Sequence, residues 1–442
     1  MNELRTELLG QIANIRRGIT YSEVTLRDSP EDGLPYINMK SFLKDGGYNQ
    51  FGLKYYAGFY TAADIANYCD LLIANTDVTR DGDIIGVPAL LPDELQKNGA
   101  LFSHHVTRLV VGTRLSVKYL YYLLCTDEYR RAMKKYARGT TVLMLDMNGI
   151  KRIPICYRVS RAKQEKVVDI LEAVDANIEK TQKLIVKYQQ IKAGLMHDLF
   201  TRGVLPNGQL RPSREQEPEL YKETAIGWIP REWDLQRCAD LCTRICVGIV
   251  IQPTQYYVEE GVPAFRSANV REVGIDPSNL VYISAVSNQL LAKSQVKAGD
   301  IVSVRTGYPG TSAIISPEFE GANCIDILIS TPGDKINSEY LCYWINSSFG
   351  KGQVLRQQGG MAQQHFNVGE MRELLVALPN ADEQIKIRDK IDAVASKLAI
   401  ERAFLEKLRT QKLGLMHDLL TDKVKVDTPE RDDARQVARL PQ

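Results

Sequence analysis

The sequence lacks most features that mark a membrane protein or a self-contained enzyme. Its apolar runs extend over only a handful of residues, too few for a transmembrane helix. The opening MNELRTELLGQ lacks the basic start and apolar stretch of a secretion signal, so the eight cysteines are expected to be reduced thiols in the cytoplasm. There is no G-x-x-x-x-G-K-[ST], no G-x-G-x-x-G after a strand, no H-E-x-x-H, no C-x-x-C and no [NDS]-P-P-[YFW]. These absences predict a cytoplasmic protein with no catalytic site of its own.

The chain also lacks a strong excess of either charge. It carries 56 Lys and Arg against 54 Asp and Glu, a net charge of +2. Residues 1–160 hold 20 basic against 17 acidic side chains, and residues 221–380 hold 13 against 16. Proteins that bind polyanions without sequence preference usually show a basic stripe. Any binding of nucleic acid must therefore depend on where individual charges are placed.

Candidate metal ligands are few. Three cysteines follow one another at a spacing of four residues: Cys238, Cys242 and Cys246. Thiolate metal sites usually reach four ligands, and no fourth is present, so the spacing favours one face of a helix that packs small apolar side chains. The adjacent His104 and His105 are interpreted as structural residues of a strand. His197 and His417, at matching ends of two expected helices, are interpreted as caps or partner contacts.

A long internal repeat dominates the sequence. The segment that begins QEKVVDILEAV at Gln164 aligns without a gap with QIKIRDKIDAV at Gln384, an offset of 220 residues in a chain of 442. The hexapeptide GLMHDL recurs unchanged at 194–199 and 414–419. A six-residue identity at the half-chain offset is very unlikely to arise by chance, so the chain is interpreted as two copies of one plan.

Both copies of the shared segment have the periodicity of a coiled coil, with spacings that alternate between four and three residues. The first seam is Val167, Leu171, Val174, Ile178, Thr181, Ile185, Tyr188, Lys192, Leu195 and Leu199. The second is Ile387, Ile391, Val394, Leu398, Glu401, Leu405, Leu408, Lys412, Leu415 and Leu419. Polar residues interrupt both seams at the same two places. The match predicts two antiparallel helices, the first roughly 57 Å long at 1.5 Å per residue, packed on each other; the alternative is two surface helices, each on its own domain.

The segments before each helix correspond more loosely. Four matched pairs carry the alignment: Gly18 with Gly248, Gly33 with Gly261, Tyr119 with Tyr340, and Gly139 with Gly360. Residues 68–76 and 298–306 are expected to be strands after a turn, and residues 117–137 and 338–358 are expected to be helices. The predicted fold is α+β, with two mixed α/β domains, two long helices and a pseudo-twofold repeat. The predicted boundaries are 1–160, 161–202 (helix), 203–220 (linker), 221–380, 381–424 (helix) and 425–442 (flexible tail).

The turns of both mixed domains carry side chains suited to DNA. Arg reads guanine and Asn or Gln reads adenine in the major groove, while Lys, Ser and Thr hold phosphates. Candidates in the first copy are Arg16, Arg17, Thr20, Tyr21, Asn38, Lys40, Ser41, Asn75, Thr79, Arg80, Arg138, Thr140 and Thr141. Candidates in the second are Arg244, Gln252, Arg266, Ser267, Asn269, Arg305, Thr306, Gln357, Gln358, Gln363 and Gln364. Their recurrence at equivalent places is a stronger indication than any single residue.

At this level of detail the chain resembles the specificity subunits of type I restriction–modification systems over nearly its whole length. The resemblance rests on the helix ends GLMHDLFT and GLMHDLLT, on Trp228-Ile-Pro-Arg-Glu-Trp233 and on LPNADEQ at Leu378–Gln384. The first copy departs from the pattern, because PICYRVSRAKQ keeps only Pro154 and Gln164 and no Trp opening precedes it.

The resemblance implies a division of labour. Each variable domain would be a target recognition domain for one half of a bipartite double-stranded DNA site, and the helices would set the unread spacer. Two modification subunits, which bind S-adenosylmethionine, would dock on this chain and methylate adenine. Restriction subunits would add ATP- and Mg-dependent translocation and cleavage. The chain itself would hold no cofactor, no metal and no catalytic residue.

Other classes of function stay open at this point. A recognition subunit of a type II system that cuts on both sides of its site could have the same sequence, and neighbouring genes would distinguish it. A coiled-coil scaffold that binds only proteins would show no salt-dependent DNA affinity. A solitary nuclease or methylase with an unrecognised site would be active as the purified chain. The DNA sequence that is read does not follow from the residues, because readout also depends on loop geometry and DNA shape.

Overall fold

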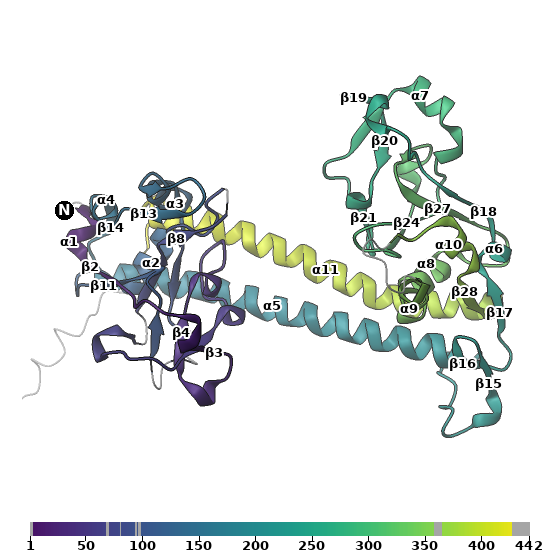
Figure 1. Cartoon of the computed structure of the whole chain (residues 1–442), viewed down its shortest axis with the longest axis horizontal. Helices are drawn as coiled ribbons and strands as arrows, with labels where there is room; N and C mark the ends of the chain where they lie inside the picture. The colour runs from purple at the N-terminus through teal and green to yellow at the C-terminus, as the bar shows by residue number, and fades with distance from the viewer. Residues whose placement is uncertain are drawn as a thin grey trace, which may run out of the picture. The chain divides into compact units, whose positions relative to one another are not determined.

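The computed structural model describes residues 3–67, 70–79, 81–92, 95, 99–357 and 365–426. The chain divides into two compact units (Figure 1). Unit 1 holds residues 1–180 and 405–442, and unit 2 holds residues 181–404. Each unit therefore combines one mixed domain with one end of each long helix.

Two sheets form the mixed domain of unit 1. The first has four antiparallel strands in the order β2 (Ala13–Arg17), β11 (Val106–Val111), β7 (Leu71–Ala74) and β9 (Pro88–Leu90). The second has five short strands in the order β3 (Leu26–Arg27), β5 (Lys54–Tyr56), β4 (Leu34–Ile37), β10 (Ala100–Phe102) and β6 (Ile65–Ala66). Only β4 and β10 pair in parallel in this second sheet. Runs of β-branched and aliphatic residues such as LLIA explain why the central strands are buried on both faces.

Smaller elements complete unit 1. Strand β1 (Leu4–Leu8) pairs with β14 (Pro154–Arg158), and a three-stranded ladder joins β12 (Ala137–Arg138), β13 (Leu143–Leu145) and β8 (Thr76–Asp77). The helices are α1 (Leu9–Ile12), α2 (Val117–Cys125), α3 (Asp127–Lys134) and α4 (Met147–Ile150). The helix expected over 117–137 is thus two helices, which part at Thr126.

Unit 2 repeats this plan. Its first sheet is β18 (Cys242–Val247), β27 (Ile327–Pro332), β24 (Ile301–Val304) and β25 (Ser312–Ile314). Its second is β19 (Tyr257–Val258), β23 (Val281–Ile283), β20 (Val262–Phe265) and β26 (Asn323–Cys324), again with one parallel pair, β20 and β26. Strand β17 (Asp234–Arg237) pairs with β28 (Leu375–Leu378) as β1 pairs with β14. The common strand order confirms the internal repeat.

The remaining elements of unit 2 are short, apart from two helices. They are the pairs β15 (Tyr221–Thr224) with β16 (Gly227–Pro230) and β21 (Val270–Arg271) with β22 (Gly274–Ile275), and the helices α6 (Cys238–Leu241), α7 (Ala285–Leu290), α8 (Ser338–Asn346), α9 (Ser348–Gln357) and α10 (Val368–Glu373). The cysteine segment does not form one helix face, as expected above: Cys238 begins α6, while Cys242 and Cys246 lie on β18. Pairing of β18 with β27 overrides the helical spacing.

Two glycines matched in sequence make the same close backbone approach. A Cβ atom added to Gly18 would lie 2.1 Å from the carbonyl oxygen of Phe102, and one added to Gly248 would lie 2.3 Å from that of Cys324. Both gaps are too short for any side chain. Glycine at these two positions therefore follows from the fold, and it explains why the sequence alignment held there.

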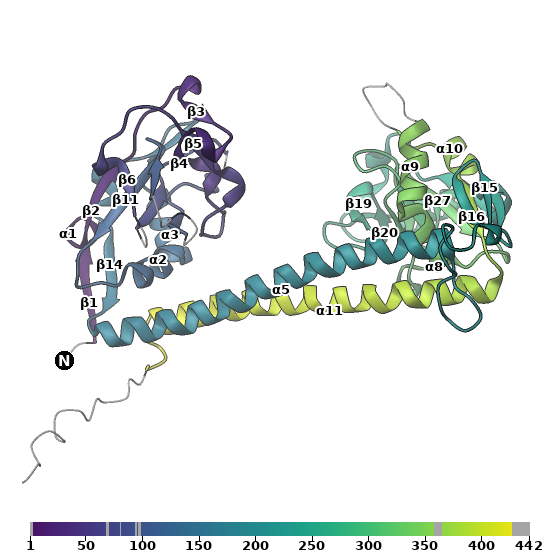
Figure 2. The same cartoon turned by 90° about the horizontal axis from the view of Figure 1, so that it is seen from below.

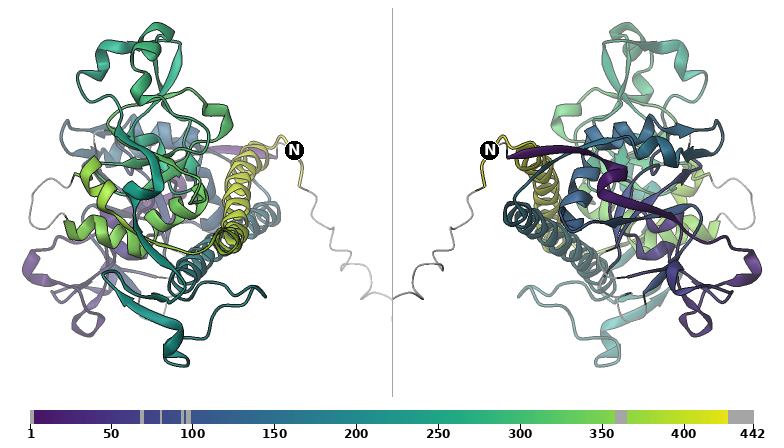
Figure 3. Two further views of the ribbon diagram at one scale, coloured as in Figure 1. Left: turned by 90° about the vertical axis from the view of Figure 1, so that its right-hand side faces the viewer. Right: turned by 90° about the vertical axis from the view of Figure 1, so that its left-hand side faces the viewer.

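The long helices are α5 (Arg161–Arg202) and α11 (Ala381–Leu420). In unit 1 the start of α5 packs against the end of α11, where Val167 and Leu171 share a buried cluster with Leu419. In unit 2 the end of α5 packs against the start of α11, where Phe200 shares a cluster with Ile391. Figures 2 and 3 show the ribbons of α5 and α11 running beside each other. The antiparallel coiled coil is confirmed, and the alternative of two separate surface helices is wrong.

One glutamine holds the entry to each helix. The side-chain oxygen of Gln164 accepts the backbone N–H of Ser116 at 2.7 Å, and that of Gln384 accepts the backbone N–H of Asn337 at 2.8 Å. Both glutamines are buried. Each satisfies the backbone N–H of the N-cap residue just before helix α2 or α8, which would otherwise lie unpaired.

Candidate nucleic-acid interface

A turn between β10 and β11, residues 103–105, lies at the centre of the polar segments of unit 1. It forms three backbone hydrogen bonds, one to each of three candidate segments: Ser103 N–H to Ile37 O at 2.9 Å, His104 N–H to Ile19 O at 2.8 Å, and Asn75 N–H to His105 O at 2.9 Å. The prediction of a strand at this histidine pair is wrong. Parallel pairing ends at the end of β10, and the chain must turn there to enter the antiparallel β11. We refer to residues 103–105 as hub 1.

A buried network of polar side chains lies behind hub 1. The Asn75 amide donates to the Thr107 hydroxyl at 2.8 Å, and the Thr76 hydroxyl donates to Asn75 Oδ1 at 2.9 Å. Thr76 Oγ1 lies 3.0 Å from His105 Nδ1 and accepts its proton in this arrangement. Asn75 and Thr76 are therefore occupied inside the protein, and they orient the His105 ring.

The histidine rings and one tyrosine form an aromatic cluster at hub 1. The centroids of the His104 and His105 rings are 3.8 Å apart, and the Tyr21 ring lies 5.8 Å from His104. Burial, followed by the nearby His104 and Arg17, lowers the pKa of His105 below its ordinary value of 6.5. His105 is therefore a neutral ring at neutral pH, available to donate and accept hydrogen bonds.

Several candidates of unit 1 are exposed around hub 1. Residues Arg17 on β2 and Thr107 on β11 are direct partners across the sheet, and β11 leads out of the hub. The ladder β8–β13–β12 joins Thr76 through Met144 to Arg138. The exposed candidates are Arg16, Arg17, Thr20, Tyr21, Lys40, Arg138, Thr140 and Thr141. The structure thus gathers segments from four parts of the sequence onto neighbouring elements.

The charged side chains exposed around hub 1 are mainly positive, and most of them have no acidic partner nearby. Within the described part of unit 1, neither Arg16 nor Arg17 forms an ion pair within 4 Å. Arg138 forms one with Asp146 at 3.0 Å, but its side chain is 80% exposed, which leaves most of the guanidinium free for a phosphate. Hydrogen bonds from the backbone of Gly149 and the Arg138 charge lower the pKa of Asp146. This surface can bind an anion without first breaking a buried contact.

Two candidates of unit 1 have their polar atoms bonded inside the protein. Asn38 accepts the backbone N–H of Lys40 at 2.8 Å and donates to Gly52 O at 2.7 Å. The Ser41 hydroxyl is fully buried and donates to the same Gly52 oxygen at 3.2 Å. Both residues shape the turn that presents Lys40.

Unit 2 has an equivalent hub at residues 325–326, between β26 and β27. Ile325 N–H donates to Phe265 O at 2.8 Å, as Ser103 does to Ile37, and Asp326 N–H donates to Ile249 O at 3.0 Å, as His104 does to Ile19. Hub 2 is one residue shorter, and Asp326 adopts a left-handed φ of 49°. Asp326 thus replaces the aromatic His104 with a carboxylate, which the Arg305 guanidinium holds in an ion pair.

The arginines and one asparagine predicted in unit 2 are largely committed to internal contacts. Arg244 bonds Asp300 at 2.6 Å and Thr331 Oγ1 at 3.1 Å. Arg305, 17% exposed, bonds Asp326 and the Phe366 carbonyl. Asn269, 1% exposed, donates to two backbone carbonyls of the next turn. The polar atoms of all three side chains are bonded within the protein, so these side chains stabilise the fold and are not free to contact DNA.

The other unit 2 candidates differ in exposure. Gln252 is exposed with a left-handed φ of 41°, while Arg266, Ser267 and Thr306 are half-buried. Arg266 donates to the Asn279 carbonyl at 2.7 Å. Five predicted contacts lie outside the described residues or have side chains outside them: Arg80, Gln357, Gln358, Gln363 and Gln364.

Sequence reasoning missed the two hubs. A histidine pair and a lone aspartate carry no motif, and their importance comes from backbone bonds to segments far away along the chain. The one available signal was position, because each hub precedes the strand that pairs with the segment just before Gly18 or Gly248. Among the described residues, no group of three or more His, Cys, Asp or Glu could hold a metal ion. No helix in the described ranges is long and apolar enough to cross a membrane.

Comparisons with known proteins agree with this architecture. Residues 3–188 match the family model described as the type I restriction modification DNA specificity domain. The chain is 23% identical over 423 residues to the type I restriction enzyme MjaVIII specificity subunit of Methanocaldococcus jannaschii, covering 91% of this chain and 89% of that one. It is 20% identical over 401 residues to the EcoBI specificity subunit of Escherichia coli, covering 87% and 77%.

Two solved structures share the fold. One is the crystal structure of the type I restriction-modification S subunit from M. genitalium, with a TM-score of 0.56, 14% identity and coverage of 96% of this chain and 97% of that one. The other comes from a study of complex assembly and conformational transition of the type I R-M system, with a TM-score of 0.52, 16% identity and coverage of 95% and 98%.

Proposed function

We propose that this chain, a member of the type I restriction–modification specificity-subunit family, reads a two-part DNA site with one recognition domain for each half. The observation that carries the proposal is the repetition of the hub. Both units use the same strand order to gather polar segments around a short turn, yet hub 1 presents histidines and hub 2 presents an aspartate. Two domains with the same backbone arrangement but different side chains at the hub are suited to read two different half-sites.

The surface around hub 1 offers both kinds of DNA contact. Exposed Lys40, Arg138 and the threonines Thr140 and Thr141 suit phosphates, which fix position without reading sequence. Arg17 and the ring of Tyr21 suit base edges, because a guanidinium can bond guanine at two atoms. His105, neutral at neutral pH, would add a donor or acceptor rather than a charge.

The partners form the second part of the proposal. Two modification subunits, which bind S-adenosylmethionine, would dock on the chain and methylate adenine, and restriction subunits would bring ATP, Mg and cleavage. Large apolar side chains on the outer faces of the helices support docking: Ile400 and Phe404 on α11 in unit 2 are 66% and 46% exposed, and Leu413 in unit 1 is 66% exposed. Docked helices would remove these side chains from water. The complex would work in the cytoplasm, where the chromosome lies.

The site test is the pattern of methylated adenines in DNA from cells that carry the system. The proposal expects two short conserved blocks separated by an unread spacer, and deletion of this gene should remove the methylation. A single undivided motif, or methylation that survives the deletion, contradicts it.

A second test separates recognition from catalysis. The purified chain should neither bind S-adenosylmethionine nor cut or methylate DNA, and addition of the modification subunit should give methylation. Methyl transfer by the chain alone, after exclusion of contaminating enzyme, would show instead that the chain is a solitary methylase.

A further inference from the structure

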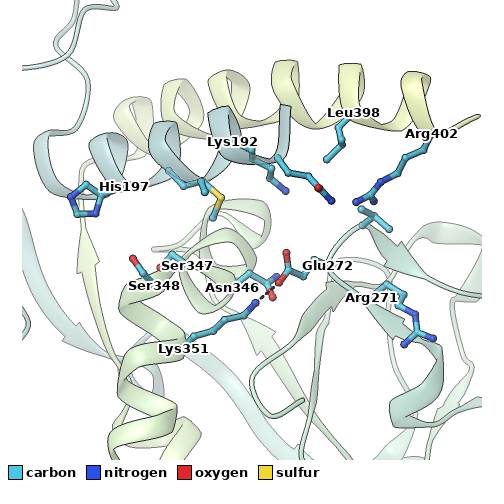
Figure 4. Close-up of a pocket in the computed structure, with 14 residues that line it drawn as sticks. Lys192, His197, Arg271, Glu272, Asn346, Ser347, Ser348, Lys351, Leu398 and Arg402 are labelled. Atoms are coloured by element: carbon cyan, nitrogen blue, oxygen red, sulfur yellow. Dashed lines mark hydrogen bonds and ion pairs between the residues drawn. The ribbon is translucent and has the colours of Figure 1, made fainter. Parts of the chain in front are cut away.

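A cavity of about 560 Å³ lies within unit 2, and its lining does not include the residues of hub 2 (Figure 4). Side chains from α5, α11, the turn between β21 and β22 and the start of α9 line it. Apolar atoms of Met196, Leu398 and Val273 form part of the wall. This volume is in the range of binding sites for small organic ligands.

Two cations face this cavity without an anion of their own. Figure 4 shows Lys192 and Arg402 pointing from the two long helices into the same space, with Glu272 on the opposite side. Lys351 forms an ion pair with Glu272, which neutralises that carboxylate. Within the described residues of unit 2, neither Lys192 nor Arg402 has an ion pair within 4 Å. Burial lowers the pKa of Lys192; the charges of Glu272 and Asp392 act in the opposite direction, and that of Arg402 adds to the lowering.

Comparison with unit 1 shows that Lys192 lacks an acidic partner that its counterpart has. Lys412 is the counterpart of Lys192 in unit 1, and each ammonium lies over a tyrosine ring, Tyr122 at 5.6 Å and Tyr343 at 5.3 Å. Lys412 is neutralised by Asp175 at 2.6 Å. The position that corresponds to Asp175, at the offset of 220, is Ala395.

The carboxylate nearest to Tyr343 replaces the missing one only in its bond to the tyrosine. Asp392 accepts the Tyr343 hydroxyl as Asp175 accepts that of Tyr122, but it lies 3.8 Å from Arg388 on the same helix and forms no ion pair with Lys192 within 4 Å. In unit 1 the lysine therefore has its own ion pair, whereas in unit 2 Lys192 and Arg402 face a cavity beyond ion-pair distance of Glu272 and Asp392. A half-buried pair of like charges is unfavourable until an anion joins it.

We infer that this cavity binds a nucleotide-sized organic phosphate, with phosphate oxygens between Lys192 and Arg402 and the apolar part against Met196 and Leu398. Phosphate suits the pair because it accepts charge-assisted hydrogen bonds from an ammonium and a guanidinium at once. The apolar wall favours an organic phosphate over the bare ion. None of the predicted DNA contacts lines this cavity, and the inference does not depend on the proposed function.

Isothermal titration calorimetry of the full chain with ATP tests the inference, with inorganic pyrophosphate and adenosine as the two partial ligands. ATP should bind saturably, and each partial ligand should bind at least tenfold more weakly. Lys192→Met should weaken ATP binding at least tenfold. The matched control is Lys187→Met, an exposed lysine on the same helix α5 that does not line the cavity; this variant should bind ATP as the wild type does.

A second variant supplies the missing anion from within. Ala395→Asp places a carboxylate where unit 1 has Asp175, so it should neutralise Lys192 and prevent ATP binding. The midpoint temperature of thermal unfolding should stay unchanged or rise. Wild-type chain that takes up no ATP at millimolar concentration overturns the inference. So does a folded Ala395→Asp or Lys192→Met variant that binds ATP as tightly as the wild type.

Discussion

At the scale of single residues, the two recognition domains differ in how far their polar side chains are already committed. Around hub 1 the exposed Arg16 and Arg17 have no close acidic partner among the described residues. In unit 2, Arg244 and Arg305 are bonded to Asp300 and Asp326. An arginine bonded to other groups of the same unit stabilises the fold, whereas an arginine without such a partner is free to bind DNA.

This difference predicts opposite effects of two alanine substitutions. Arg17→Ala should weaken DNA binding by the assembled complex by roughly 1–3 kcal/mol and leave unfolding unchanged. Arg305→Ala should lower the free energy of unfolding by about 1–3 kcal/mol, because the fold loses the bonds of the largely buried Arg305 to Asp326 and to the Phe366 carbonyl. Fluorescence anisotropy with labelled DNA and urea unfolding measure the two effects. Equal loss of stability in both variants would contradict the assignment, and Asp326→Asn serves as the second variant at hub 2.

His105 predicts a dependence of stability on pH. Its pKa is lowered in the folded state, so as pH falls below about 6.5 the unfolded chain takes up a proton before the folded chain does. Stability from this residue is therefore present above that pH and is lost as the pH falls from there toward the depressed folded pKa. Urea unfolding of His105→Asn should show a smaller loss between neutral pH and pH about 5.5 than the wild type. Identical slopes would show that His105 titrates normally.

At the scale of elements, the segment that joins α5 to β17 also fixes the start of α11. The predicted linker, residues 203–220, contains Arg211, whose side chain is 6% exposed and bonds Glu383, which is 4% exposed. Trp233 Nε1 donates to the same carboxylate at 3.0 Å. Glu383 thus joins the linker, the strand entry and helix α11. The corresponding residue in the first helix is Lys163, which forms an exposed pair with Glu3.

The buried pair and its exposed counterpart offer a matched test. Arg211→Met leaves Glu383 buried and unpaired, which should lower the free energy of unfolding by about 3–5 kcal/mol. Lys163→Met removes a pair whose members are 24% and 40% exposed, and should cost at most about 1 kcal/mol. Chemical denaturation with both variants measures the contrast. Similar small losses would mean that water or a shifted side chain compensates Glu383.

At the scale of the whole molecule, each unit has its own core and its own end of the helix pair. The core of unit 1 joins β-strand residues such as Ile155 with Val167 and Leu419, and that of unit 2 joins Val376 with Phe200 and Ile391. Neither core needs residues from the other unit. Recognition of the two half-sites should therefore be separable.

Exchange of residues 1–155 for the equivalent segment of a relative should change one half-site and leave the other. The expected result follows from the separate cores, because the second unit keeps all of its packing. Methylation mapping of cells that carry the chimaera measures both halves. A change in both halves together would show that the two copies are not independent readers.

The length of the long helices should set the number of unread base pairs between the two half-sites. Four residues inserted near Thr181 lengthen α5 by roughly 6 Å, and such an insertion in a heptad seam unwinds the coil locally without destroying it. Base pairs rise roughly 3.4 Å each, so the unread spacer should grow by one or two base pairs while both half-sites stay the same. Methylation mapping again gives the result. An active variant that keeps the original spacer would show that something other than this helix sets the distance.

The sequence by itself determined the features that depend on local periodicity and on repetition. The 3.5-residue seam and the offset of 220 identified both long helices, and the looser correspondence of the mixed domains matched Gly18 with Gly248. Hydrophobic runs located β7 and β24 to within a few residues. Helices and strands place side chains on one face at fixed residue spacings. The order of apolar and polar residues along the chain therefore shows which face of an element meets the core.

Only the tertiary structure decided which polar side chains are free. Arg305 and Arg17 look alike in the sequence, yet one meets Asp326, 21 residues away, and the other meets no acidic side chain among the described residues. The same holds for Lys412 and Lys192, which share a seam position and differ because Asp175 faces one and a cavity faces the other. A polar group is bonded or exposed according to its neighbours in space, and strand pairing over long separations brings those neighbours together.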